Sequence, residues 1–256
     1  MKFSEIENIN DMKNLFSANS ENYERFRPDY PDALYKYIFQ YVRSFDQAWD
    51  CATGNGQAAK YLSTVFKQVE ASDISDGQLD NAYQNFNIHY RQSPAESTPF
   101  KDNRFDLITV AQAFHWFNFE QFFREAKRVL KPGGVLAVWT YDLLKIEDRI
   151  DQAIGDFYHN VVGPYWESER KHVDRRYGDV KFPFRHVQTE TFSIKKEWSL
   201  QQLIGYVQTW SSVAKYQKDH RENPVNALHD QLKQLWTHGV YEIIFPTTVF
   251  VAFEDQ

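Results

Sequence analysis

The stretch that decides the fold reads Gln47-Ala48-Trp49-Asp50-Cys51-Ala52-Thr53-Gly54-Asn55-Gly56-Gln57. A short apolar run ends in an acidic residue and a turn of small residues, and a helix-compatible segment follows from Gln57 to Phe66. Such a turn exposes backbone N–H groups at a helix N-terminus, and its glycines have no Cβ to keep a ligand from the main chain. The pattern therefore predicts a ligand-binding turn between a strand and a helix.

A second acidic residue stands at the spacing of a ribose-binding carboxylate. Seventeen residues after Gly56, the strand-like run Val69–Ser72 ends in Asp73. A carboxylate there is placed to accept hydrogen bonds from the two hydroxyls of a ribose, so the pattern predicts a cofactor that contains adenosine. Capping of the next helix is the structural alternative for Asp73. The run from Gly54 to Ala59 also fits the G-x-G-x-x-A fingerprint, which leaves a nicotinamide oxidoreductase open.

Apolar runs alternate with helical patterns over the first 140 residues. This order indicates βαβ units and a parallel, doubly wound α/β sheet. The expected strands are Ala48–Cys51, Val69–Ser72, Ile88–Gln92, Phe105–Ala111 and Val135–Thr140, and the expected helices are Gln57–Phe66, Gly77–Asn85 and Phe119–Leu130. The run Lys131-Pro132-Gly133-Gly134 is expected to close the last helix before its strand begins. Further on, two β-like segments, His186–Ile194 and Ile243–Phe253, are separated by helical material.

Composition restricts the class of protein. The chain has 256 residues, 42% hydrophobic content and a net charge of −6, so one sizeable core is expected and nucleic acid is not expected as a partner. No apolar run is long enough for a membrane span, and Met1–Glu5 is polar, so we expect a cytoplasmic protein. Cys51 is the sole cysteine, which excludes an internal disulfide and a cysteine-based metal cluster; no metal is expected.

The order of several further motifs carries a resemblance to a known family. The blocks are Phe16-x-x-Asn19-x-x-x-Tyr23-x-x-x-Arg27-Pro28-x-Tyr30-Pro31, the turn at Asp50–Gly56, Ser72–Ser75, Ala95–Phe100, Phe105–Thr109, Ala113–Phe117 and Glu125–Gly134. With these blocks in this order, the chain resembles the class I S-adenosylmethionine-dependent methyltransferases. Within them it resembles the small-molecule branch that includes the trans-aconitate methyltransferase-like proteins. The resemblance implies a mostly parallel seven-stranded sheet with an antiparallel last strand and helical insertions.

The resemblance also implies a set of residues that bind S-adenosylmethionine. The turn Ala52–Gly54 would hold the methionine part, Asp73 the ribose, and Ile74 would lie against the adenine ring. Ala95 and Glu96 would offer groups to the adenine edge. The remaining members of the implied set are Tyr23, Arg27, Asp50, Thr53, Ala111 and Gln112. For Arg27, a clamp on the methionine carboxylate and a surface pair with Asp29 or Glu24 both remain open.

Ala52 departs from the family, which usually has glycine at this position. We expect alanine to be tolerated because it fits any backbone conformation with φ below zero. The departure keeps a third function open beside methyltransferase and nicotinamide oxidoreductase: a non-catalytic protein that binds S-adenosylmethionine.

Methyl transfer from a sulfonium is an in-line displacement, so the protein mainly positions a nucleophile and excludes water. His115 follows the fourth strand and is the candidate general base; packing beside Trp116 and Phe117 is the favoured alternative. The Asn/Asp-Pro-Pro-Tyr/Phe motif of nucleobase amino-methyltransferases is absent after this strand, where Ala111-Gln112-Ala113-Phe114 stands. The expected acceptor is therefore a small organic molecule, with a carboxylate as one candidate.

A single domain is expected, with residues 1–35 as an N-terminal lid and 36–140 as the cofactor-binding core. Residues 141–183 and 199–240 are expected to form helical insertions on the acceptor side. Aromatic residues make up 17% of the chain, and those in its second half suggest an aromatic acceptor pocket. Its candidate residues are Tyr141, Phe157, Tyr158, Trp166, Tyr206 and Trp210.

Overall fold

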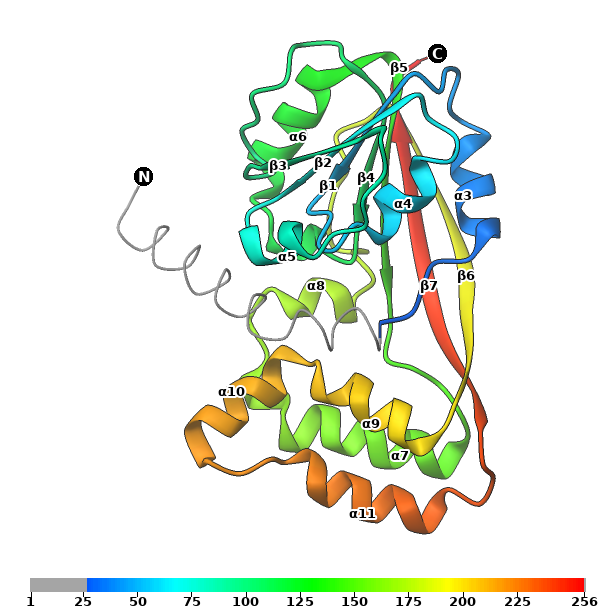
Figure 1. Cartoon of the computed structure of the whole chain (residues 1–256), viewed down its shortest axis with the longest axis vertical. Coiled ribbons are helices and arrows are strands. Elements are labelled where there is room, and N and C mark those ends of the chain that lie inside the picture. Colours follow the sequence, from blue (N-terminus) through cyan, green and yellow to red (C-terminus); the bar gives the residue numbers. More distant parts are fainter. Residues whose placement is uncertain (1–26, 256) are drawn as a thin grey trace.

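A seven-stranded sheet organises the molecule, in the order β3-β2-β1-β4-β5-β7-β6 (Figure 1). The computed structural model describes residues 27–255. Strand β7 runs antiparallel to both of its neighbours, while the pairs among β1 to β5 are parallel, as expected. The bounds are β1 Gln47–Cys51, β2 Gln68–Asp73, β3 Ile88–Gln92, β4 Phe105–Ala111, β5 Leu130–Tyr141, β6 His186–Trp198 and β7 Tyr241–Phe253. The strand order reverses between β1 and β4, and ligands of such sheets bind at the carboxyl ends of the strands there.

The helices fall into two groups (Figure 1). The first accompanies the parallel strands and comprises α3 Asp32–Phe39, α4 Gln57–Leu62, α5 Asp76–Asp80 and α6 Phe119–Val129. The second consists of α7 Asp148–Asp156, α8 Arg170–Asp174, α9 Leu200–Gln208, α10 Ser211–His220 and α11 Val225–Leu235. In Figure 1, α7, α9, α10 and α11 form a layer below the sheet, and α8 lies between this layer and the sheet. A π-helical turn, Phe157–Val161, and 3₁₀ turns at Phe114–Trp116 and Gly163–Tyr165 complete the described elements.

The core is built in three buried clusters. One lies on the α6 side of the sheet and includes Trp49 and Ile108, and another lies on the α3 and α4 side and includes Leu107. Adjacent residues such as Leu107 and Ile108 enter different clusters because side chains of a strand alternate between the two faces. The third cluster fills the helical layer below the sheet and includes Tyr206 and Phe245.

Most elements differ from their expected bounds by one or two residues, β6 extends to Trp198 instead of Ile194, and three further differences bear on the connections between elements. Helix α4 ends at Leu62 instead of Phe66, and α5 spans Asp76–Asp80 instead of Gly77–Asn85. Strand β5 already begins at Leu130, because the pairing with β4 shifts register and residues 131–134 form an irregularity within the strand. The Gly133 backbone has φ 75°, and a Cβ on Gly134 would lie 2.9 Å from the carbonyl oxygens of Lys131 and Phe105. The two glycines therefore shape this irregularity, whereas the sequence predicted that they end a helix.

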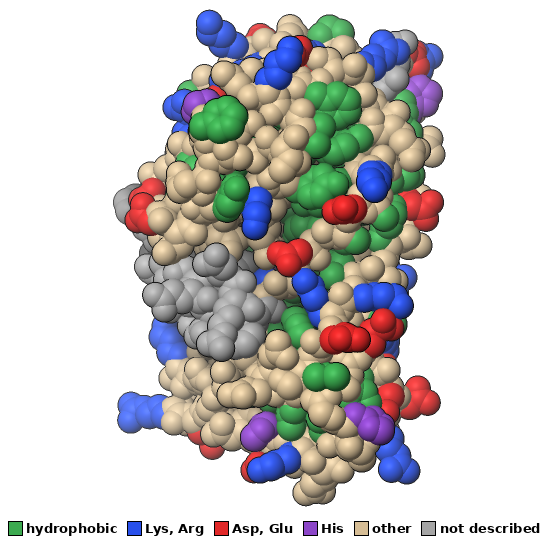
Figure 2. Space-filling view, turned by 45° about the vertical axis from the view of Figure 1, so that its right-hand side comes forward, with side chains coloured by type: hydrophobic (Ala, Val, Ile, Leu, Met, Phe, Trp, Pro, Cys, Tyr) green, Lys and Arg blue, Asp and Glu red, His purple; other side chains and the backbone are tan. Residues whose placement is uncertain are grey.

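The surface turned forward in Figure 2 mixes its charges. Lys and Arg side chains stand among Asp and Glu side chains, and hydrophobic side chains gather in a stripe over the upper half of this face. No helix within residues 27–255 has the length and hydropathy that crossing a bilayer requires.

Candidate functional site

Asp50 anchors the turn that follows β1. Its side chain is buried, with an exposed fraction of 1%, and it accepts three hydrogen bonds from three different segments. Oδ2 accepts from Thr53 Oγ1 at 2.5 Å and from the Ala59 N–H at 2.9 Å, and Oδ1 accepts from Thr109 Oγ1 at 2.8 Å. Burial raises the pKa of Asp50 to about 6, although these hydrogen bonds act in the opposite direction. The carboxyl group thereby joins the turn, helix α4 and strand β4.

The turn itself is left-handed at several positions. Gly54 has φ 57° and Gly56, which precedes α4, has φ 85°. Ala52 has φ 53°, so the expectation that alanine stands here with a negative φ is wrong. A residue with a Cβ is destabilised in this left-handed backbone region by of order 1 kcal/mol or more. Such a conformation is retained only where the surrounding structure enforces it. Thr53 and Ala59, which follow Ala52 in the chain, donate hydrogen bonds to Asp50, which precedes it. These bonds hold the chain on both sides of Ala52 and explain how its conformation is maintained.

Asp73 closes the other side of the turn. Its Oδ2 accepts a hydrogen bond from the Gly54 N–H at 2.9 Å, and Oδ1 accepts from the Ser75 N–H at 2.9 Å. Burial raises its pKa, while the backbone donors counteract this effect. The capping of α5 belongs to Ser75, whose side chain accepts from the Gln78 N–H. Each carboxylate oxygen has a second lone pair, so Asp73 can accept two further hydrogen bonds.

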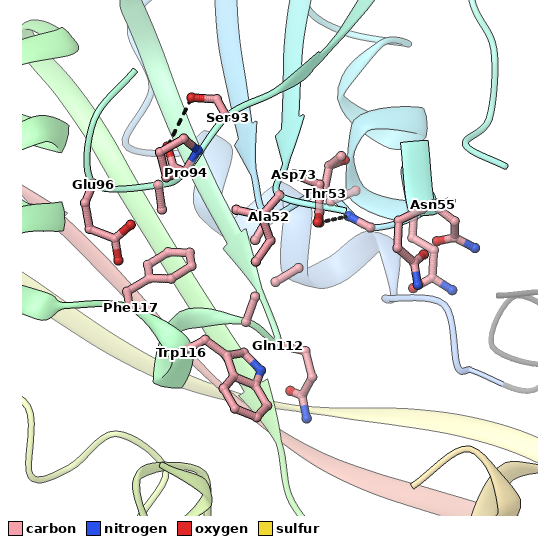
Figure 3. Close-up of a pocket in the computed structure, with 18 of the residues that line it drawn as sticks. Ala52, Thr53, Asn55, Asp73, Ser93, Pro94, Glu96, Gln112, Trp116 and Phe117 are labelled. Carbon is pink, nitrogen blue, oxygen red and sulfur yellow. Dashed lines mark hydrogen bonds between the residues drawn. The ribbon is translucent and has the colours of Figure 1, made fainter. Parts of the chain in front are cut away.

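These groups lie on one cavity of about 470 Å³ at the carboxyl ends of β1, β2 and β4 (Figure 3). The turn after β1 and Asp73 form one wall, and the loop 93–97 after β3 faces them. Trp116 and Phe117 present their rings from the segment after β4. Among the described lining residues the charged ones are Asp73 and Glu96, so the described wall has a negative charge.

Gln112 lines the cavity and connects its wall to the end of β5. It follows β4 with φ 56°, a second left-handed residue without the freedom of glycine. Its side chain holds the backbone of Tyr141 at both ends, since Oε1 accepts from the N–H at 2.8 Å and Nε2 donates to the carbonyl at 3.3 Å. Gln112 thus fixes the end of β5 beside the cavity.

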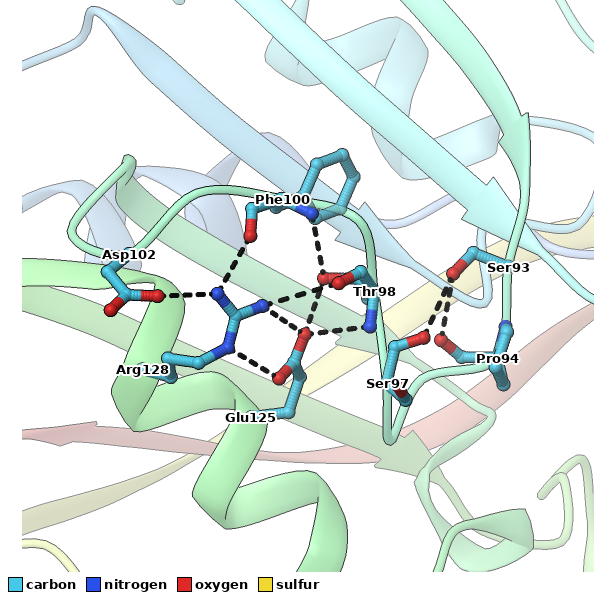
Figure 4. Close-up of polar contacts among 8 residues, drawn as sticks. All are labelled: Ser93, Pro94, Ser97, Thr98, Phe100, Asp102, Glu125 and Arg128. Atoms are coloured by element: carbon cyan, nitrogen blue, oxygen red, sulfur yellow. Dashed lines mark hydrogen bonds and ion pairs between the residues drawn. The ribbon is translucent and has the colours of Figure 1, made fainter.

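The loop after β3 is held in place by an ion-pair network (Figure 4). Glu125 Oε1 accepts hydrogen bonds from the N–H of Thr98 at 2.8 Å and from its Oγ1 at 2.5 Å. Arg128 binds both oxygens of Glu125 and also donates to the Phe100 carbonyl and to Asp102. Burial raises the pKa of Glu125, but the hydrogen bonds from Arg128 and Thr98 outweigh burial and lower it. This network positions the loop after β3, whose residues 93–97 line the cavity.

Nine of the residues expected to bind cofactor line the cavity, namely Ala52, Thr53, Gly54, Asp73, Ile74, Ala95, Glu96, Ala111 and Gln112. Asp50 lies behind the turn rather than on the wall. Arg27 does not line the cavity, and Tyr23 lies outside the described residues, as does most of the expected lid. Sequence reasoning missed several lining residues, among them Gln78, Ser93, Ser97 and Asn118. Their proximity to strand ends is the signal that would have indicated them.

His115 lies beside the cavity but does not line it. Its side chain is buried, with an exposed fraction of 5%, and its Nδ1 lies 3.1 Å from the hydroxyl of Tyr177. Its ring stands 4.9 Å from that of Trp116, which does line the cavity. Burial, followed by the charges of Arg170 and His172, lowers the pKa of His115 well below its ordinary value, so the imidazole is neutral near pH 7.

The six aromatic residues expected to form an acceptor pocket come together in the helical layer. Tyr141, Phe157, Tyr158, Tyr206 and Trp210 are buried in its core cluster, and Trp166 packs against them. They do not line the cavity described above. Their role in binding an acceptor stays a prediction.

Known proteins are similar to this chain in sequence and in fold. Residues 49–138 match the methyltransferase domain family. A Dictyostelium discoideum protein assigned as a methyltransferase is 39% identical over 249 residues, which cover 94% of this chain and 95% of that protein. A solved structure assigned as a type II methyltransferase from Anaeromyxobacter dehalogenans has 30% identity and a TM-score of 0.81, covering 89% of this chain and 98% of the other.

A Haemonchus contortus phosphoethanolamine N-methyltransferase, solved with S-adenosylmethionine, shares the fold, with a TM-score of 0.53 and 17% identity. That match covers 94% of this chain and 57% of the other. The chain belongs to the methyltransferase domain family and is a class I S-adenosylmethionine-dependent methyltransferase. This membership decides against the nicotinamide oxidoreductase that the glycine fingerprint alone left open.

The buried carboxyl group of Asp50 predicts a pH-dependent stability. The pKa of Asp50 is about 6 in the folded protein and about 3.9 when unfolded. The stabilising contribution of its protonated form to the free energy of unfolding is therefore complete below pH 3.9 and is lost as the pH rises through 6. Asp50→Asn removes this titration. The variant's free energy of unfolding relative to the parent should therefore rise by about 2–3 kcal/mol between pH 4 and pH 7. Urea unfolding at both pH values measures this change, and Asp80→Asn, at an exposed acid, is the control. If the free energies of unfolding of Asp50→Asn and the parent differ by the same amount at both pH values, the raised pKa of Asp50 is contradicted.

For His115 we expect a mild kinetic effect of substitution. A buried, neutral imidazole that does not line the cavity is poorly placed to take a proton from an acceptor. His115→Gln should keep most of kcat and leave the pH–rate profile unchanged, measured as S-adenosylhomocysteine formation. A loss of about 10²–10⁴-fold in kcat, with cofactor affinity intact, would instead identify His115 as a general base.

Proposed function

We propose that the cavity between the β1 turn, Asp73 and the loop 93–97 is the S-adenosylmethionine site, and that the acceptor is a small organic molecule. The observation that carries this proposal is the convergence of a left-handed small-residue turn and a ribose-type carboxylate on one cavity. The expectation of a small-molecule branch, to which trans-aconitate methyltransferase-like proteins belong, is part of this proposal.

The lining residues suit the chemistry of this cofactor. Asp73 retains acceptor capacity on both oxygens for two ribose hydroxyls. Ile74 offers an apolar side chain to the adenine ring, and Ala95 and Glu96 border the same region. Ala52 and Gly54 bring the main chain to the cavity wall, where backbone groups can bind the methionine part. The negative charge of the described wall is compatible with a sulfonium, which supplies the electrophilic methyl group.

The cavity favours an acceptor that is already ionised. Its titratable described residues are Asp73, Glu96 and Tyr30. Both oxygens of Asp73 hold backbone N–H groups, and Glu96 Oε1 accepts from the Asn118 N–H at 2.9 Å. Both carboxylates are therefore occupied by hydrogen bonds from the backbone. A nucleophile that needs no proton removal, such as a carboxylate, fits this site best. The protein would then act mainly by positioning the acceptor and excluding water.

Ligand selectivity tests the cofactor. The protein should bind S-adenosylmethionine and S-adenosylhomocysteine in a calorimetric titration and should not bind NAD. A screen of small organic acids that measures S-adenosylhomocysteine release tests the acceptor class. Binding of NAD without binding of S-adenosylmethionine would end the proposal.

Asp73 provides the sharpest test of the ribose assignment. Asp73→Ala removes a charged acceptor for two hydroxyls and should weaken S-adenosylhomocysteine binding by about ten- to a hundredfold. Asp80→Ala, an exposed acid at the end of α5, is the matched control and should bind like the parent. Circular dichroism verifies that both variants are folded. Parent-like affinity in a folded Asp73→Ala protein would place the ribose elsewhere.

A further inference from the structure

Strand β6 is a long, regular edge of the sheet. It stands last in the strand order and pairs with β7 along its whole length, from His186 to Trp198. Within residues 27–255 no strand pairs with its outer side, and the strand contains no proline. Proteins usually keep edge strands short or interrupt them, because the backbone groups of a long edge invite pairing with another strand. The opposite edge strand, β3, is short in this way, whereas β6 is not.

The backbone of β6 presents alternate residues to this outer side. Pro246 of β7 has no N–H, and its carbonyl accepts a hydrogen bond from the N–H of Asp142, on the β5 side. The N–H and C=O of one strand residue point to the same side, so Ser193, which lies opposite Pro246, turns its backbone groups away from β7. The Thr191 N–H, two residues away, accordingly donates to the side chain of Glu190 at 2.9 Å. Ser193 can therefore pair with a further strand.

Side chains of opposite charge stand on one face of β6, at equal distances from Ser193. Glu190 precedes Ser193 by three residues, and Lys196 follows it by three. Their face is the one toward α3, because Phe192 between them contacts Tyr37 with ring centres 5.7 Å apart. An acid and a lysine placed in this way complement themselves when the strand is rotated by 180° about its central residue.

Partly exposed aromatic side chains accompany the same edge. Tyr37 and Tyr41 of α3, Phe192 of β6 and Phe253 of β7 form a chain of ring contacts, with centres 5.4–5.7 Å apart. In Figure 2, which brings this side of the molecule forward, hydrophobic side chains form a stripe over the upper half. Apolar surface is therefore available beside the backbone edge, as an interface requires.

We propose that β6 pairs antiparallel with β6 of a second copy of this chain, about a two-fold axis through Ser193. In this register Ser193 exchanges both of its backbone hydrogen bonds with its copy. Glu190 of each copy lies opposite Lys196 of the other, and the paired segment reaches from Gln188 to Trp198. Main-chain hydrogen bonds supply affinity in such an interface, and side-chain pairs fix its register.

Charge selects this register among the symmetric alternatives. Centring the pair on an acid or a lysine of the strand puts like charges directly opposite one another, which is destabilising. Centring it on any uncharged residue other than Ser193 places no acid opposite a lysine. Lys196 Nζ already lies 3.1 Å from the exposed carboxylate of Asp29. An ammonium group has three N–H donors, so Lys196 can bind Glu190 of the other copy as well.

A proline substitution tests the backbone pairing. Ser193→Pro removes an outward N–H and leaves the hydrogen bonds between β6 and β7 intact, so it should weaken dimerisation by about tenfold or more. Val187→Pro removes an outward N–H outside the paired segment and is the matched control, which should dimerise like the parent. Sedimentation velocity measures self-association. A parent that stays monomeric up to about 100 μM, or a folded Ser193→Pro variant that dimerises like the parent, overturns the inference.

Charge reversal tests the register. Glu190→Lys and Lys196→Glu each place like charges opposite one another in a symmetric dimer, and each should weaken self-association by about tenfold or more. A dimer of one variant with the other restores both pairs of opposite charge, so mixing the two proteins should recover association. Glu197→Lys, on the other face of β6 and opposite Thr189 of the copy, is the control and should associate like the parent.

The charge-reversal pair decides even if a proline variant does not fold. Single variants that dimerise like the parent, or two folded variants that stay monomeric when mixed, overturn the inference. Circular dichroism verifies folding of each variant. Association is measured without cofactor or acceptor, so this inference can fail while the proposed function stands.

Discussion

The buried carboxyl group of Asp50 is the interaction on which the cofactor half of the structure depends. It receives hydrogen bonds from Thr53, Ala59 and Thr109, and these lie in the turn, in α4 and in β4. The bonds hold the turn in a conformation that places Ala52 at a positive φ, which an alanine does not adopt readily. The turn also directs the Gly54 N–H toward Asp73. The buried carboxyl group of Asp50 therefore supports the position of Asp73. The energetic cost of burying Asp50 is visible in its raised pKa.

The two halves of the molecule differ in what they contain. The parallel strands and their short connections form the cavity with its two acids, and the Glu125–Arg128 network holds the loop after β3 that lines it. The helical layer below carries a cluster of buried aromatic side chains, and Gln112 on the cavity wall is hydrogen-bonded to the backbone of Tyr141, a member of that cluster.

Sequence patterns predicted the fold well because strand and turn signals are local. The alternation of strands and helices, and the turn after β1 with Asp73 beside it, follow from residue types at fixed spacing. Backbone conformation at Ala52 and Gln112 could not be predicted, since neither residue carries the glycine signal for positive φ. The start of β5 at Leu130 was missed because a Pro-Gly-Gly run usually ends structure, whereas here it lies within a strand. The positions of Arg27 and Arg170 depend on tertiary contacts that no short pattern encodes.

The central claim is that the cavity at the carboxyl ends of β1, β2 and β4 holds the cofactor through Asp73. A crystal structure of the protein with S-adenosylhomocysteine tests it most directly. The account predicts ribose hydroxyls within hydrogen-bond distance of Asp73, the adenine ring against Ile74, and the methionine part on the turn from Ala52 to Gly54. A ligand bound outside this cavity, or a ribose without contact to Asp73, would contradict it.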